Sequence, residues 1–404
     1  MPDLITEFLS YTEGAPSPEI FRLWSAIACI GAALERRVWT LSAGLPIYPN
    51  LYTLLVAPPG VGKYIIHEVQ SIWIETRNLK VAPHSTTKAS LIDSLKESLR
   101  VINGGGELIE YHSLQVAAEE FGVLVPAYDL EYLSNLNHIF NNPSFHSEKR
   151  RSINKGEDLI VTNPQLNILA GTQPGYLGTL FPEEAWTMGL ASRLLMIYAG
   201  DPIQVELFPE NDILADRIRG RAGFVKLISG LNDLRGCFDW TDDAIQVIRS
   251  WYLAGMPPRP DHSKLTFYSS RRILHLFKLA MIAAVSRSQD LVITLADLSR
   301  ARDWLLEAEV QMPNIFRAMS HRSDYEIMQE LHVYLWSRWS NPKNKQLPLR
   351  EDLLYTYLST KCTSERAPRI VDVMERGGLV SRVAGTQSPE ALYIPNPRKE
   401  HGVE

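Results

Sequence analysis

The stretch LYTLLVAPPGVGKYIIHEV, residues Leu51–Val69, decides the fold that we expect of this chain. An apolar run ends in APPGVGK, residues 57–63, and a helix-like pattern follows it. This order predicts a strand, a glycine-rich loop and a helix N-terminus, which is the design of a phosphate-binding P-loop. The glycines let backbone N–H groups face an anion, and the helix start adds positive potential. The alternative, a Gly/Pro-rich turn with a chance lysine, explains neither the strand before the loop nor the helix after it.

The end of this loop carries the residues that would contact phosphate and metal. Lys63 is expected to reach the β- and γ-phosphates of a nucleotide. The next position normally holds Ser or Thr, whose hydroxyl binds Mg²⁺. Here it is Tyr64, whose hydroxyl lies too far from the backbone to replace it. The loop therefore predicts nucleotide binding more firmly than efficient hydrolysis. The predicted nucleotide-binding residues of the loop are Pro59, Gly60, Val61, Gly62, Lys63 and Tyr64.

The composition is typical of a cytoplasmic protein with more than one domain. A length of 404 residues suggests roughly two to three domains, and 45% hydrophobic residues are enough for proper cores. Because the net charge is −5, any binding of nucleic acid must come from local basic elements. The 3 cysteines have no metal-ligand spacing and predict no disulfide framework. The start MPDLITEF lacks the features of a signal peptide, and no apolar run is long enough to cross a membrane.

Alternating apolar strands and helices predict an α/β fold with a mainly parallel sheet. A helix is expected to begin at Pro18-Glu19 and to end at Arg36-Arg37. The expected core strands are residues 50–57, 114–118, 166–170 and 194–198, and the helices between them are 65–77, 88–99 and 130–140. Helical spacing returns at 243–253, 270–286 and 295–310. Three helices at 325–339, 350–358 and 363–376, followed by a hairpin at 379–383 and 392–394, predict a winged helix.

These patterns predict five segments. The segments are an N-terminal helical segment at 1–45, a P-loop core at 46–204, a helical lid at 205–322, a winged-helix domain at 323–395 and a disordered tail at 396–404.

Two further groups of residues stand at the ends of apolar strands, as an NTPase site requires. Glu119 and Glu120 close one strand, where one carboxylate would position Mg²⁺ and the other would orient the attacking water. Aspartate normally holds the metal position that Glu119 fills here. Gln173 closes the strand in NILAGTQP and would touch the γ-phosphate or the attacking water. Solvent-exposed strand ends are the alternative for both groups.

Three arginines are candidates for contact with the nucleotide. Arg193, in GLASRLL, stands at the start of an apolar strand and would enter a neighbour's site in a ring assembly. Arg271 and Arg272 begin the helix SSRRILHLFKLAMIAA and would reach back to nucleotide from a lid. A surface position or a local ion pair is the alternative for each.

Basic residues in two places predict contact with DNA. Residues 148–161 form an expected hairpin that carries Lys149, Arg150, Arg151 and Lys155, and a projecting basic hairpin suits contacts to phosphates. In the winged helix, Arg366 and Arg369 lie on the expected recognition helix and Arg382 lies in the wing. The alternatives are a solvated loop for the hairpin and a plain interaction module for the winged helix.

The order of these motifs resembles that of AAA+ ATPases of the minichromosome-maintenance helicase type. APPGVGK is followed by LQVAAEE, the basic hairpin, NILAGTQP, GLASRL, SSRRILHLFKLA and a winged helix. The likeness is greatest to ATPases associated with primases and helicases of phages and plasmids, and it covers roughly residues 15–395. It implies sensor 1 at Gln173, an arginine finger at Arg193, sensor 2 at Arg271 or Arg272, and a hairpin tip at Lys155. Tyr64 and Glu119 depart from the family pattern.

The resemblance implies a ring of identical chains that binds ATP and Mg²⁺ and acts on DNA during replication of a mobile element, as a helicase. Single-stranded DNA in a central pore and a replication partner such as a primase are the implied partners, with no membrane involved. A nucleotide-gated DNA-binding or helicase-loader protein with little hydrolysis is the alternative that Tyr64 favours. A transposition-type target-selection ATPase is a third possibility.

Overall fold

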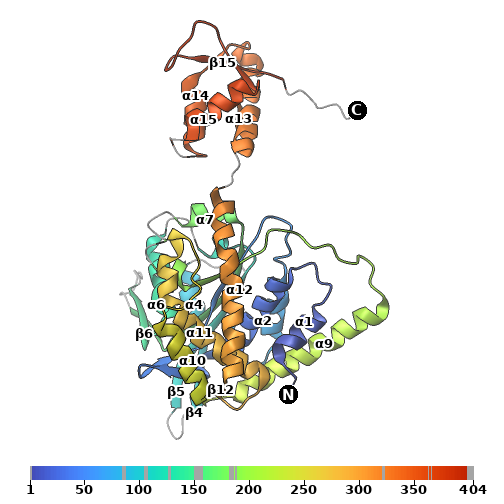
Figure 1. The fold of residues 1–404 in the computed structure, drawn as a ribbon, viewed down its shortest axis with the longest axis vertical. Coiled ribbons are helices and arrows are strands. Elements are labelled where there is room, and N and C mark those ends of the chain that lie inside the picture. The colour runs from blue at the N-terminus through green and yellow to red at the C-terminus, as the bar shows by residue number, and fades with distance from the viewer. Residues whose placement is uncertain are drawn as a thin grey trace. The chain divides into compact units, whose positions relative to one another are not determined.

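The computed structural model describes residues 2–83, 88–103, 108–125, 129–149, 158–181, 186, 189–320, 324–362, 364 and 366–397. The chain forms two compact units, Met1–Arg317 and Ala318–Glu404. Figure 1 shows both units as ribbons coloured from the N-terminus to the C-terminus. No helix within the described residues is both long enough and apolar enough to traverse a bilayer.

A five-stranded sheet forms the centre of the first unit, in the order β4-β5-β8-β3-β9. Strands β3, β5, β8 and β9 run parallel, and only the edge strand β4 is antiparallel. Strands β3 and β8 are buried along their whole length, as expected for parallel strands covered on both faces. The α/β class and the mainly parallel sheet are therefore confirmed. The bounds are β3 (Tyr52–Val56), β4 (Leu99–Asn103), β5 (Leu108–Ala118), β8 (Pro164–Thr172) and β9 (Leu194–Tyr198).

Two N-terminal helices pack on this core. Helix α2 (Glu19–Leu34) contacts strands β3, β8 and β9 and helix α3 (Ile65–Glu75). Helix α1 (Leu4–Tyr11) packs against α2 and α9 (Asn211–Gly230). After α2 the chain forms strand β1 (Val38–Ser42), which pairs with β2 (Leu45–Ile47) and β10 (Gly236–Cys237). The sequence analysis predicted neither β1 nor α9.

Shorter elements complete the core around the sheet. Helix α4 (Lys88–Glu97) precedes β4, α5 (Phe121–Leu124) follows β5, and α7 (Pro174–Leu180) follows β8. Helix α6 (Leu130–Phe140) leads into the antiparallel pair β6 (Phe145–Lys149) and β7 (Asp158–Thr162). These two strands are the arms of the predicted hairpin. Its tip, with Arg150, Arg151 and Lys155, lies outside the described residues.

The rest of the first unit is helical. It contains α10 (Asp242–Leu253), α11 (Thr266–Arg287) and α12 (Leu295–Ser320), with the short parallel pair β11 (Asp239–Trp240) and β12 (Val292–Ile293). A buried ion pair joins two of these helices, since Arg272 of α11 donates to both carboxylate oxygens of Glu309 on α12.

The second unit combines three helices with a three-stranded antiparallel sheet in the order β13-β15-β14. Its core is apolar and includes Leu331, Leu354, Ile370 and Tyr393. The helices are α13 (Asp324–Trp339), α14 (Glu351–Ser359) and α15 (Arg366–Arg376). The strands are β13 (Leu349–Arg350), β14 (Val380–Arg382) and β15 (Leu392–Pro395). From residue 398 on, the predicted tail lies outside the described residues.

Candidate functional site

The loop between β3 and α3 has the backbone of an anion-binding turn. Gly60 has a φ of +81° and Gly62 a φ of +53°, which are left-handed conformations that L side chains rarely adopt. Helix α3 begins at Ile65, directly after Tyr64. A loop in this conformation before a helix N-terminus brings backbone N–H groups and the positive end of the helix dipole to the same place. The local geometry is therefore suited to phosphate.

Lys63 lies within this loop. Its ammonium group donates to the carbonyl oxygens of Ala57 and Pro58, at 3.0 and 3.1 Å. Burial lowers the pKa of Lys63 below its ordinary value, and the nearby carboxylates of Glu120 and Glu119 partly offset this effect. The charge of Lys63 is thus held close to two carboxylates by contacts that a bound phosphate would replace.

A cavity of about 450 Å³ brings most of the predicted nucleotide residues together. It lies where β3, β5 and β8 end, because parallel neighbours present their carboxyl ends at one edge of a sheet. Its lining residues are Pro16, Pro59, Gly60, Val61, Gly62, Lys63, Tyr64, Glu119, Glu120 and Gln173. A cavity that combines a lysine, two carboxylates and an amide at a helix start fits a nucleotide phosphate chain with Mg²⁺, which proteins usually hold through one or two carboxylates plus phosphate.

Gly171 allows the three strand ends to approach one another. A Cβ at this position would lie 2.4 Å from the carbonyl oxygen of Glu119 and 3.2 Å from Cδ of Lys63. Any side chain at Gly171 would therefore push apart the loop and the carboxylate strand. Gln173 follows two residues later as the cap of α7 and lines the cavity.

Glu119 has a partner that the sequence analysis missed. His67 Nε2 lies 3.0 Å from Glu119 Oε2, and both side chains are about half exposed. His67 stands on the first turns of α3, four residues after Lys63. Among the described residues no group of three or more His, Cys, Asp or Glu side chains could hold a metal by itself. Any divalent cation here would need the phosphates as ligands and would compete with His67 for Glu119.

The segment before α2 covers the loop, which the sequence analysis also missed. A Cβ on Gly62 would lie 2.1 Å from the carbonyl oxygen of Pro16 and 2.6 Å from Cα of Ser17. The hydroxyl of Ser17 is buried and makes no hydrogen bond within the described part of the chain. The small residues of this segment are the only signal that could have pointed to so close a contact.

Tyr64 lies between two cavities. It lines the phosphate cavity and also a second cavity of about 220 Å³, whose other lining residues include Tyr11, Thr12, Ala15, Ile65 and Ile218. The side chain is 37% exposed, and burial together with Glu68 raises the pKa of its phenol, so the hydroxyl stays neutral. Tyr64 is therefore a wall of the site.

The structure does not bring the three predicted arginines into the phosphate cavity of their own chain. Arg193 is 7% exposed and donates to the carbonyl oxygen of Gly189 at 2.8 Å. Burial lowers the pKa of Arg193 to about 10, and neighbouring Arg271 lowers it further. Arg271 is partly buried, whereas Arg272 is fully buried in its ion pair with Glu309. Arg193 and Arg271 thus form a cationic pair, and Arg272 holds α11 to α12.

The predicted DNA-binding residues lie elsewhere in the fold. Lys149 ends β6, and its side chain lies outside the described residues, as do Arg150, Arg151 and Lys155. In the second unit, Arg366 pairs with Asp324 at 2.6 Å, and Arg382 donates to the hydroxyl of Tyr393. Arg369 is exposed on α15.

Comparison with protein-family models found no match for the chain, and comparison with curated proteins found none either. The arguments below therefore rest on the chain's own residues.

Proposed function

We propose that this chain is an ATP-binding protein of the AAA+ class that assembles into a ring and acts on DNA as a helicase in replication of a phage or mobile element. The observation that carries the proposal is the single cavity at the ends of β3, β5 and β8, lined by Lys63, Glu119, Glu120 and Gln173. Each strand contributes one part of an NTPase site, as the order of the motifs implies.

In this proposal the loop binds the phosphates and the carboxylates organise the chemistry. Lys63 exchanges its contacts with Ala57 and Pro58 for phosphate oxygens, where a charge-assisted hydrogen bond is worth more. When bound, Mg²⁺ neutralises phosphate charge, and Glu119 would hold it. Glu120 would accept a proton from the attacking water, and Gln173 would orient that water. The apolar cavity beyond Tyr64 would take the nucleobase.

Arg193 and Arg271 support assembly rather than binding in the same chain. Both are missing from the phosphate cavity, yet they lie close enough for Arg271 to lower the pKa of Arg193. Arg271 makes no ion pair with any of the described carboxylates. A neighbour's γ-phosphate would satisfy this pair of cations, provided that Arg193 leaves the carbonyl of Gly189.

A nucleotide-gated DNA-binding or loader protein with little hydrolysis is the second candidate. The observation that favours it is the contact between His67 and Glu119, together with Tyr64 at the position of the usual Ser or Thr. Both features weaken the metal site without harming the phosphate loop. DNA binding in either case is proposed for the hairpin of β6 and β7 and for the second unit, whose three helices and antiparallel strands agree with the predicted winged helix.

The test measures the ATPase rate with and without single-stranded DNA, and DNA binding in parallel. A motor gives a rate that DNA stimulates, whereas a loader binds ATP and DNA with a slow, unstimulated rate. Replacing Arg150, Arg151 and Lys155 with Ala should weaken binding to any DNA sequence and lower the salt slope of log affinity by about one per lost phosphate contact. Unchanged DNA binding across a salt titration would remove the hairpin from the proposal.

A further inference from the structure

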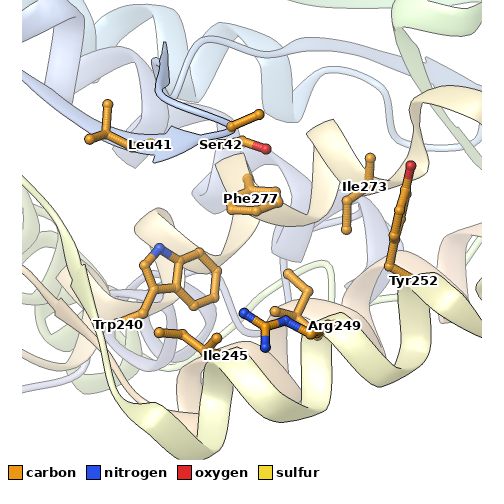
Figure 2. Close-up of a pocket in the computed structure, with 10 residues that line it drawn as sticks. Leu41, Ser42, Trp240, Ile245, Arg249, Tyr252, Ile273 and Phe277 are labelled. Atoms are coloured by element: carbon orange, nitrogen blue, oxygen red, sulfur yellow. The ribbon is translucent and has the colours of Figure 1, made fainter.

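A cavity of about 530 Å³ lies away from the phosphate site, among β1, α10 and α11. Its lining is aromatic and aliphatic, and it includes Trp240, Phe277, Ile245, Ile273 and Leu41 (Figure 2). Figure 2 shows the side chains of Ile273 and Phe277 on α11 facing those of α10 across this space. Nothing in the proposed nucleotide chemistry uses these residues.

The aromatic wall of this cavity is held in place before any ligand binds. The indole N–H of Trp240 donates to the hydroxyl of Thr40 at 2.7 Å. Trp240 and Phe277 meet edge to face with 5.1 Å between ring centroids. Tyr252 stands at the mouth and is 54% exposed. A preformed aromatic pocket binds an apolar side chain at a low cost in conformational entropy.

Arg249 gives the pocket a charge preference. It lines the cavity from α10, is exposed, and forms no ion pair with the described acidic residues. A suitable occupant therefore has an apolar group that fills the pocket and an acidic group that meets Arg249 at its rim.

The loop before α9 has this chemistry. Its sequence Val205-Glu206-Leu207-Phe208-Pro209-Glu210 places two large apolar residues between carboxylates. Leu207 is 77% exposed and Phe208 is 87% exposed, which is unusual for such side chains in a protein that buries its core well. The carboxylate of Glu206 accepts the backbone N–H of Phe208 at 2.9 Å, so the turn that displays the pair is fixed.

The loop cannot fill the pocket of its own chain. In Figure 1 the loop runs into the start of α9 on the right of the first unit, whereas α10 lies on the left. Loop and pocket are thus two different surfaces, and their contact between copies would be head to tail. A contact of this kind closes into a ring or continues as a filament.

We infer that the Leu207–Phe208 loop of one copy docks into the Trp240–Phe277 pocket of the next copy, with Glu206 or Glu210 facing Arg249. This docking would add to the ring of the proposed function a contact that does not involve nucleotide. The inference deepens that function, but its test does not require ATP to bind.

The test uses two variants of the full chain and follows mass by analytical ultracentrifugation. The loop variant is Leu207→Ser with Phe208→Ser, and the pocket variant is Tyr252→Ser with Arg249→Glu. All four positions are exposed, so the fold should tolerate the changes. Ile203→Ser in the loop and Leu253→Ser on α10 are matched controls, since both are exposed and neither is part of the proposed contact.

Wild type and controls should assemble beyond dimers, and each variant alone should stay monomeric. An equal mixture of the two variants should form dimers and nothing larger, because one intact loop and one intact pocket remain. A labelled peptide of residues 201–212 should bind the loop variant and should lose on the order of tenfold affinity or more when Phe208 is replaced by Ala.

The inference is overturned if wild type is monomeric, if either variant assembles as wild type does, or if the mixture gives no dimer. Failure of the peptide to bind also overturns it, including the case in which the pocket instead binds a peptide of another protein. ATP affinity is measured for every variant. Normal ATP binding with normal assembly in both variants rejects the docking alone, whereas loss of ATP binding by wild type rejects the proposed function alone.

Discussion

His67 on α3 shares a hydrogen bond with Glu119 at the end of β5, with 3.0 Å between His67 Nε2 and Glu119 Oε2. This contact joins the phosphate-binding helix to the strand that carries the expected metal ligand. The carboxylate is half exposed, so the contact is a weak one that a cation is able to displace. The relationship makes Mg²⁺ binding and the His67 contact mutually exclusive at one oxygen of Glu119.

Replacing His67 with Ala should therefore lower the Mg²⁺ concentration that half-saturates ATP binding or hydrolysis. An exposed pair is worth about 0.2–1 kcal/mol, which corresponds to a change of roughly 1.4- to 5-fold. Magnesium titrations of wild type and His67→Ala measure it, with Ile74→Ala as a control on the exposed face of the same helix. An unchanged Mg²⁺ requirement would show that Glu119 does not bind the metal.

Tyr64→Ser should raise the ATPase rate roughly tenfold, because a short hydroxyl at the end of the loop is able to bind Mg²⁺ directly and a contact to a charged group is worth about 1.5–3 kcal/mol. Tyr64→Phe is the matched control, since it keeps the ring between the two cavities and should leave the rate unchanged. Steady-state phosphate release provides the measurement. If serine is no faster than wild type, the tyrosine does not limit hydrolysis.

Gly62→Ala should destabilise the protein and weaken ATP binding together. Its Cβ would meet the carbonyl of Pro16 at 2.1 Å, and its φ of +53° adds strain of about 1–3 kcal/mol. Gly60→Ala is the control, because its φ is +81° but no atom lies within 4 Å of the added Cβ. Thermal melts and ATP titrations should show a larger loss for Gly62→Ala. Equal losses would mean that the Pro16–Ser17 segment does not constrain the loop.

The two arginines at the start of α11 should differ in what they support. Arg272→Ala leaves Glu309 buried without its partner and should cost about 3–5 kcal/mol of stability. Arg271→Ala removes a partly buried cation with little effect on folding, but it should slow hydrolysis in assembled protein. Denaturant melts and ATPase assays separate the two. A stable Arg272→Ala protein, or an Arg271→Ala protein that hydrolyses ATP normally, would contradict these assignments.

The sequence predicts the elements of the site better than the surfaces around it. Strand β9 and helix α6 have the bounds that apolar periodicity predicts, and the loop from Pro59 to Lys63 lies where its glycines indicate. These features depend on local pattern alone. The convergence of Glu119 and Gln173 beside Lys63 also follows, because each residue ends a parallel strand of the same sheet.

What the sequence could not predict depends on contacts between distant segments. Helix α9 was missed because its apolar and charged residues do not separate onto clear faces, and only Phe224 and Ile228 are buried. The contact of Pro16 with Gly62, and that of His67 with Glu119, appear only after folding. Arg272 shows the same limit, since no local pattern distinguishes a buried partner of Glu309 from a residue that faces nucleotide.

The central claim is that ATP binds in the cavity at Lys63, and calorimetric titration of ATP with Mg²⁺ into wild type and Lys63→Ala tests it most directly. Lys63 provides a close positive charge in a partly buried loop, and a hydrogen bond to a charged group is worth about 1.5–3 kcal/mol. The account predicts one ATP per wild-type chain and an affinity lower by roughly tenfold or more in Lys63→Ala. Equal affinity of the two proteins, or no binding by wild type, would contradict it.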